Sequence, residues 1–219
     1  WSSDVCSSDL EWDTVVMKPL TSDGPRVAAL FAGDIDLIEN PPLQDLARIK
    51  ADKKLKVEQS ISNRVIYIHL TSGPDSHKSI MGTDNKNPLK DIRVREALSI
   101  AINRDAIVSR VMGGVAIAAG ELLPAGMFGA HPDGQMKPPA FNADRAKKLL
   151  AEAGYPNGFT LTLGTPNDRY INDAEVAQAV AQMWSRIGVK TNIDAMTAST
   201  FFSRRNKVDF PAYLADRKS

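Results

Sequence analysis

The residues best suited to bind a ligand lie in one short polar run, Pro166-Asn167-Asp168-Arg169-Tyr170. The run follows an alternating apolar segment typical of a strand and precedes an apolar periodicity typical of a helix. Ligands of open α/β sheets bind outside the carboxyl ends of strands, where a helix N-terminus adds N–H donors and positive potential. We therefore expect Arg169 to clamp a carboxylate or phosphate, with Asn167 and Tyr170 beside it. The competing interpretation is a capped turn with an exposed arginine.

No other set of residues has the types and spacing of a known catalytic or metal-binding motif. The chain has no His-x-x-x-His pair, no paired cysteines, no P-loop and no Gly-x-Ser-x-Gly turn. We expect no catalytic residues, no metal site and no cofactor. Side chains that could suggest otherwise have ordinary structural interpretations: His69 in a strand, His77 and His131 in loops, Asp34 and Asp36 at a helix or strand end, and the basic run 203–207 on a solvated helix face.

Composition excludes several classes of protein. Lys and Arg total 27 against 26 Asp and Glu, which gives a formal net charge of +1 among 219 residues. This balance argues against an obligate nucleic-acid binder, and 6% aromatic residues are too few for a base-stacking platform. No run of about 18 apolar residues is present, so no segment is expected to span a membrane.

Apolar periodicity indicates alternating strands and helices, which is typical of an α/β fold. The segment 159–196 reads as strand, loop, helix and strand, with the length that a right-handed parallel crossover requires. The expected strands are 14–17, 35–38, 55–57, 64–70, 159–163 and 189–196; the expected helices are 22–32, 43–50, 92–102, 105–112, 142–154 and 171–187.

Two segments interrupt this pattern. Residues 1–10 are rich in Ser and Asp, contain the only cysteine, Cys6, and resemble a translated sequencing-adapter remnant, so we expect them to be non-native. Residues 71–90 are rich in turn-forming residues, and we expect them to link two structural units. Without an initiator Met or an evident terminal element, the chain is expected to be a fragment.

Four stretches, in the same order, resemble the oligopeptide/dipeptide/nickel-type solute-binding proteins of ABC importers, family 5. The similarity extends over residues 12–214. It is carried by residues 26–36 (RVAALFAGDID), 87–104 (NPLKDIRVREALSIAINR), 146–159 (AKKLLAEAGYPNGF) and 180–190 (VAQMWSRIGVK).

The resemblance implies a two-lobed, periplasmic-binding-protein-like fold of type II, the Venus-flytrap fold. Residues 11–70 would be part of lobe I, 71–90 a hinge-side linker and 91–210 most of lobe II. In dipeptide-binding relatives an arginine at the loop position of Arg169 clamps the ligand carboxylate. Relatives carry a Gly-Trp pair followed by an acidic residue near the position of Leu214, and this chain departs from that pattern. Residues 211–219 are therefore a second candidate for a non-native segment.

The function implied is capture of a peptide or similar small polar solute and its delivery to ABC permease subunits in the membrane. The complete protein would be a periplasmic or otherwise extracytoplasmic monomer, and nucleic acid is not expected as a partner. Two alternatives stay open. One is a non-peptide ligand on the same fold, such as a nickel chelate, an opine or a sugar. The other is a ligand-sensing or enzymatic domain on a related α/β scaffold.

Overall fold

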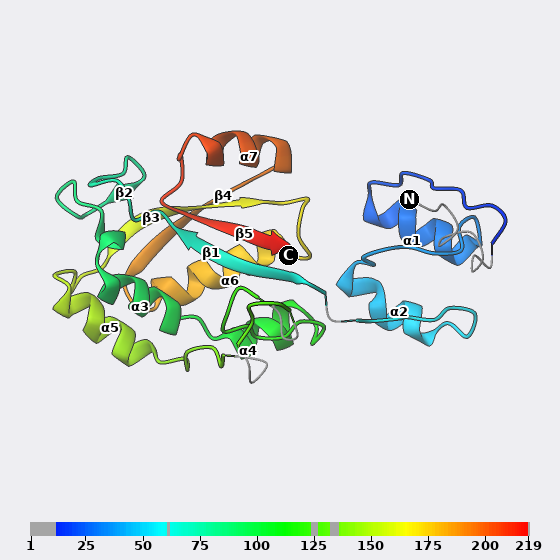
Figure 1. Cartoon of the computed structure of the whole chain (residues 1–219), viewed down its shortest axis with the longest axis horizontal. Coiled ribbons are helices and arrows are strands. Elements are labelled where there is room, and N and C mark those ends of the chain that lie inside the picture. Colours follow the sequence, from blue (N-terminus) through cyan, green and yellow to red (C-terminus); the bar gives the residue numbers. More distant parts are fainter. Residues whose placement is uncertain (1–11, 61, 124–126, 132–135, 219) are drawn as a thin grey trace. The chain divides into compact units, whose positions relative to one another are not determined.

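The computed structural model describes residues 12–60, 62–123, 127–131 and 136–218 (Figure 1). The chain divides into two compact units, Trp1–Val57 and Glu58–Ser219. The expected non-native segment 1–10 lies outside the described residues.

The first unit is helical in its described part. It contains α1 (Asp23–Ala32), the 3-10 helix η2 (Leu43–Asp45) and α2 (Leu46–Ala51). Helix α1 confirms the predicted helix, and it ends at Gly33, whose φ of 79° lets its N–H reach the last carbonyls. The strands expected at 14–17, 35–38 and 55–57 are wrong, since residues 12–57 form no strand. Each short β-type run lacks a neighbouring strand with which to pair, and isolated strands are not stable.

The second unit is built on one five-stranded mixed sheet. Strands β3 and β4 pair in parallel along their whole length, which confirms the predicted crossover. Strand β1 pairs antiparallel with β5. Strand β5 pairs in parallel with β3, at residues of β3 that follow those paired with β2. The strands are β1 (Arg64–Leu70), β2 (Ile80–Met81), β3 (Phe159–Pro166), β4 (Val189–Met196) and β5 (Ala212–Lys218).

Helices cover both faces of this sheet (Figure 1). Helices α3 (Ile92–Ile100), α5 (Ala143–Glu152) and α6 (Asp173–Ser185) share one apolar core with β3 and β4. Helix α7 (Ala198–Asn206) lies on the other face, where Phe201 packs on Phe210 and Tyr213. The shorter elements are η3 (Pro88–Lys90), α4 (Arg104–Ala106) and the π-helix η4 (Ile107–Val111).

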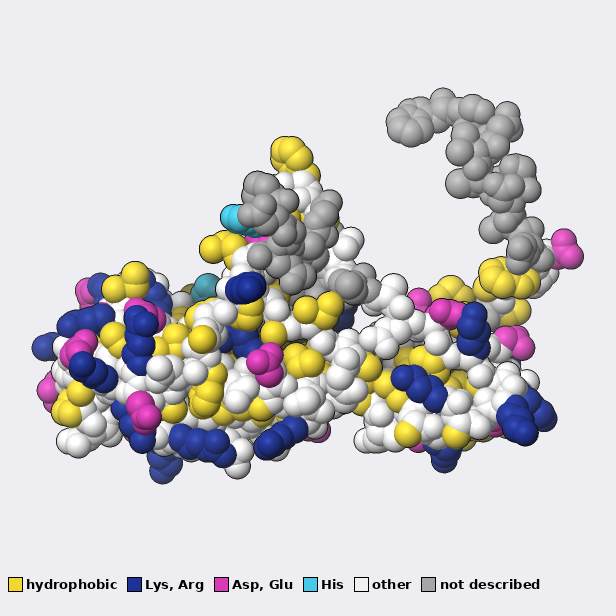
Figure 2. Space-filling model, turned by 90° about the horizontal axis from the view of Figure 1, so that it is seen from below, with side chains coloured by type: hydrophobic (Ala, Val, Ile, Leu, Met, Phe, Trp, Pro, Cys, Tyr) yellow, Lys and Arg dark blue, Asp and Glu magenta, His cyan; other side chains and the backbone are white. Residues whose placement is uncertain are grey.

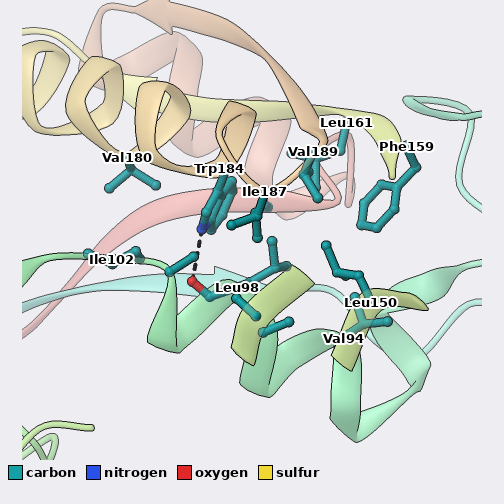
Figure 3. Close-up of a cluster of buried hydrophobic side chains, with 14 of the residues drawn as sticks. Val94, Leu98, Ile102, Leu150, Phe159, Leu161, Val180, Trp184, Ile187 and Val189 are labelled. Carbon is teal, nitrogen blue, oxygen red and sulfur yellow. Dashed lines mark hydrogen bonds between the residues drawn. The ribbon is translucent and has the colours of Figure 1, made fainter. Parts of the chain in front are cut away.

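Trp184 joins α6 to the C-terminus of α3 (Figure 3). Its side chain is 1% exposed, and its Nε1–H donates to the backbone O of Leu98 at 2.9 Å. The last carbonyls of a helix lack partners within the helix, and inside a core they must find them elsewhere. The carbonyls of Ser99 and Ile100 are likewise satisfied, by the Arg104 guanidinium and by the N–H of Asn142. The end of α3 therefore holds α6 and the start of α5 in place.

The segment expected to link two lobes, 71–90, lies within the second compact unit, and the division between the compact units falls at Val57. Its turns are tied together by Asn87, which is 4% exposed and donates to the carbonyls of Thr71 and Pro74. Strand β2 within the segment pairs with β3. The expected lobe I strand 64–70 is also part of this sheet, because its partner is β5. Turn-rich composition signalled irregular backbone here, but irregular backbone can still be firmly hydrogen-bonded.

Limited digestion with trypsin tests this boundary. We expect cleavage after Lys53 or Lys54, which are exposed beside the junction of the units, to precede cleavage after Lys78 or Lys86. Cleavage requires local opening, and the segment that contains Lys78 and Lys86 must break sheet and Asn87 hydrogen bonds to open. Mass spectrometry of early fragments measures the order, and early cleavage within 71–90 would contradict the boundary at residue 57.

Replacing Trp184 tests the connection between α6 and α3. Trp184→Phe should lower the free energy of unfolding by about 1–3 kcal/mol, because the buried carbonyl of Leu98 loses its donor. Urea unfolding measures the change. The control is Trp12→Phe, which removes an indole that is 69% exposed and should leave the free energy of unfolding nearly unchanged.

The starts of β3 and β4 approach so closely that only glycine fits between them. Gly158 has a φ of 70°, and a Cβ built on it would lie 1.9 Å from the carbonyl O of Gly188. The left-handed conformation alone costs a residue with a side chain about 1–2 kcal/mol. Backbone atoms cannot move aside as a flexible side chain can.

We expect Gly158→Ala to lower the free energy of unfolding by about 2–4 kcal/mol. Gly73→Ala is the matched control, because a Cβ at Gly73 meets nothing within 4 Å. Urea titrations of the two variants should separate clearly, and equal midpoints would show that the β3–β4 contact tolerates a methyl group.

Candidate functional site

The polar run singled out in the sequence forms the loop between β3 and α6, at the carboxyl end of β3. The loop is anchored to the neighbouring strand and helix. The N–H of Asn167 donates to the O of Met196, the last residue of β4, at 2.9 Å. The carboxylate of Asp168 accepts from the N–H of Ala198, the first residue of α7, at 2.7 Å. These bonds hold the loop against the carboxyl ends of both parallel strands.

Asp173 shapes the same loop from within, a role that sequence reasoning missed. Its Oδ2 accepts the N–H groups of Arg169 at 3.1 Å and Tyr170 at 3.0 Å, and its Oδ1 accepts that of Ala174. Its side chain is buried, and this burial raises the pKa of Asp173 despite the three N–H donors. In the sequence, the Asn172-Asp173 pair at the helix start could have indicated this role, because Asn and Asp commonly cap helices there. Backbone donors expected to face a ligand are thus partly occupied by Asp173.

Three cationic or phenolic groups meet around one carboxylate next to this loop. The Tyr170 hydroxyl donates to Oδ1 of Asp216 at 3.2 Å. Oδ2 of Asp216 lies 3.5 Å from Arg64 Nε and 4.0 Å from Arg169 Nη2. That Oδ2 is buried and accepts no hydrogen bond from the described residues. The arrangement can hold an anion, and the aspartate here makes only one good hydrogen bond.

The three predicted ligand residues lie differently within the site. The Arg169 side chain is 37% exposed and can reach solvent, while Tyr170 is 7% exposed and forms a wall. Burial raises the pKa of Tyr170, and the nearby Asp216 carboxylate raises it further, so the phenol stays protonated as a donor. Asn167 is exposed at the start of the loop, and the structure records no side-chain hydrogen bond that joins it to the Asp216 cluster.

The basic run of α7 is not simply a solvated helix face, contrary to expectation. Arg204 forms ion pairs with Asp194 at 2.8 Å and Asp209 at 3.5 Å. The Arg205 guanidinium lies 4.8 Å from the centre of the Phe202 ring, and that of Arg169 lies 5.6 Å from the same centre. Helical spacing alone could not show that Arg204 pairs with Asp194 on β4 or that Arg205 lies over the Phe202 ring.

His69 and His77 make contacts outside this loop. His69 stacks on Tyr213 with ring centres 4.6 Å apart, in keeping with the structural role expected for it. His77 lies 3.1 Å from the Val208 carbonyl, and Asp34 and Asp36 are exposed. Within the described residues no three His, Cys, Asp or Glu side chains gather as a metal site would require.

The surface charge agrees with the balanced composition on the face that Figure 2 shows. Lys and Arg side chains lie at many separate points there, with Asp and Glu between them (Figure 2). In the part of the chain that the structure describes, no helix has both the length and the apolar character to cross a bilayer.

Comparison with known proteins identifies the family. The chain is 31% identical over 188 residues to heme-binding protein A of Haemophilus influenzae, covering 82% of this chain and 31% of that protein. It is 30% identical over 184 residues to the dipeptide-binding protein of Escherichia coli, covering 83% and 32%. The chain thus spans about a third of the length of these relatives.

A solved structure shows the same fold. It is that of the ABC transporter-associated periplasmic binding protein DppA of Helicobacter pylori in complex with the peptide STSA. The TM-score is 0.74 at 22% identity, over 91% of this chain and 36% of that one. The sequence pattern of the family described as bacterial extracellular solute-binding proteins, family 5 Middle, matches residues 8–217. This chain therefore belongs to family 5 of the bacterial extracellular solute-binding proteins.

Proposed function

We propose that this chain is part of the substrate-binding component of an ABC importer, which captures a peptide or similar small polar solute between two lobes. The complete protein would act in the periplasm or another extracytoplasmic space and deliver its ligand to the membrane permease. Relatives are named for binding heme and a dipeptide, and both ligands carry carboxylates. Within the two-lobed fold, the unit that starts at Glu58 would be lobe II, and the described residues before it part of lobe I.

The observation that carries this proposal is the meeting of Arg64, Arg169 and the Tyr170 hydroxyl around one carboxylate. Asp173 holds the backbone of the loop that bears Arg169, so less of the loop has to be ordered when an anion binds. We assign Arg169 to the ligand carboxylate, with Tyr170 as the buried wall and Asn167 at the solvent side. Asp216 marks a position at which these three groups accommodate a carboxylate.

Substitution of Arg169 tests the assignment by calorimetric titration of the complete protein with the dipeptide Ala-Ala. Arg169→Ala should weaken binding about ten- to hundredfold, because a charge-assisted hydrogen bond contributes roughly 1.5–3 kcal/mol. Arg169→Lys should recover part of the loss, since it keeps the charge but not the planar fork. Arg186→Ala is the control, because Arg186 is exposed at the opposite end of α6.

A second ligand separates a direct contact from a general loss of structure. The C-terminal amide of Ala-Ala lacks the carboxylate and should bind the wild type weakly, and Arg169→Ala should not weaken it further. Equal losses for the peptide and its amide would show that Arg169 acts on the fold or on another part of the ligand. Unchanged affinity for Ala-Ala would return Arg169 to the role of an exposed turn residue.

A further inference from the structure

Phe202 on α7 lies between two arginines that come from different elements. The guanidinium centres of Arg205, one turn further along α7, and of Arg169, on the β3–α6 loop, lie 4.8 Å and 5.6 Å from the centre of its ring. Phe202 itself is only half-buried, so part of the ring is open to solvent. Two cationic groups therefore approach one partly exposed apolar ring.

Arg205 differs from its neighbour Arg204 in how its charge is balanced. Arg204 forms ion pairs with Asp194 and Asp209, whereas Arg205 forms none with the described residues. Its charge still acts on its surroundings, because together with burial it lowers the pKa of His69. The rings of Phe202 and Tyr213 also interact with Arg205, and neither supplies a negative charge. The ring face of Phe202 attracts the cation but leaves it able to bind an anion.

We propose that Phe202 and Arg205 form a second anion subsite next to Arg169, so that the preferred ligands are acidic peptides. This inference rests on the proposed function, in which Arg169 binds the terminal carboxylate. A C-terminal glutamate fits the arrangement: its α-carboxylate binds Arg169, its methylene groups lie on the Phe202 ring, and its side-chain carboxylate reaches Arg205. The shared ring keeps the two guanidinium groups close enough for one residue of the ligand to bind both.

The balance of charge favours a ligand with two negative groups over one with a single group. The guanidinium groups of Arg169 and Arg205 approach the same ring, and like charges that approach one another repel. Asp216 already lies 4.0 Å from Arg169, whereas no carboxylate of the described residues forms an ion pair with Arg205, so a second carboxylate on the ligand would neutralise Arg205. Because both arginines are partly exposed, the gain is modest, and we expect a preference of about five- to tenfold.

The test compares Ala-Glu with Ala-Gln, which differ by one charge and almost nothing in shape. Calorimetric titration of the complete protein should show Ala-Glu binding about five- to tenfold more tightly than Ala-Gln. Arg205→Gln should reduce this ratio to about one without changing the affinity for Ala-Gln. The matched control is Lys207→Gln, which removes one positive charge at the exposed end of the same helix and should preserve the ratio.

A further variant covers the case in which Arg205→Gln fails to fold. Arg205→Lys keeps the charge but loses the flat guanidinium that stacks on Phe202, and it should retain only part of the preference. Equal affinity of the wild type for the two peptides, or an unchanged ratio in both Arg205 variants, would overturn the second subsite and leave the Arg169 assignment standing. Failure of both peptides to bind would instead overturn the proposed peptide function, and this inference with it.

Discussion

The parallel pairing of β3 with β4, held by α6 across their face, is the constraint on which the rest of the second unit depends. Helix α6 can cross only where Trp184 reaches the end of α3, because the Leu98 carbonyl is buried and needs a donor. That bond and the shared apolar core fix α6 against α3 and the sheet. The close approach of Gly158 and Gly188 sets the same two strands in register at their other end.

The position of the candidate site depends on this pairing of β3 with β4. Because β3 and β4 end side by side, the loop after β3 can bond to the last residue of β4 and to the first residue of α7. The buried carboxylate of Asp173 accepts N–H groups of the loop and so holds it against the start of α6, and the Arg169 side chain there is 37% exposed. A binding residue on a firmly held loop needs less ordering when the ligand arrives. The same geometry brings Arg169 to Phe202, a residue distant from it along the chain.

Sequence patterns predicted some elements well and others poorly, for physical reasons. Helix α1, strand β1 and the strand–helix–strand unit of β3, α6 and β4 were predicted because their apolar periodicity and capping residues are local. The short β-type runs before residue 57 were mistaken for strands, since pairing depends on a partner that local sequence does not reveal. The turn-rich segment 71–90 lies within the second compact unit, where its β2 residues pair with β3 about 80 residues further along the chain, a contact that local composition does not reveal.

The order of residues alone determined the α/β class, the crossover unit and the placement of Arg169 after a strand and before a helix. It did so because backbone preference and the buried face of an element depend on neighbours within a few positions. Only the tertiary structure decided which arginines are neutralised: Arg204 has Asp194 and Asp209, whereas Arg205 lies over an aromatic ring and has no carboxylate partner among the residues that the structure describes. It also decided that the Asp173 carboxylate accepts hydrogen bonds from the N–H groups of Arg169 and Tyr170. Charge pairing and satisfaction of backbone donors depend on distances in space, which the spacing of residues along a chain does not specify.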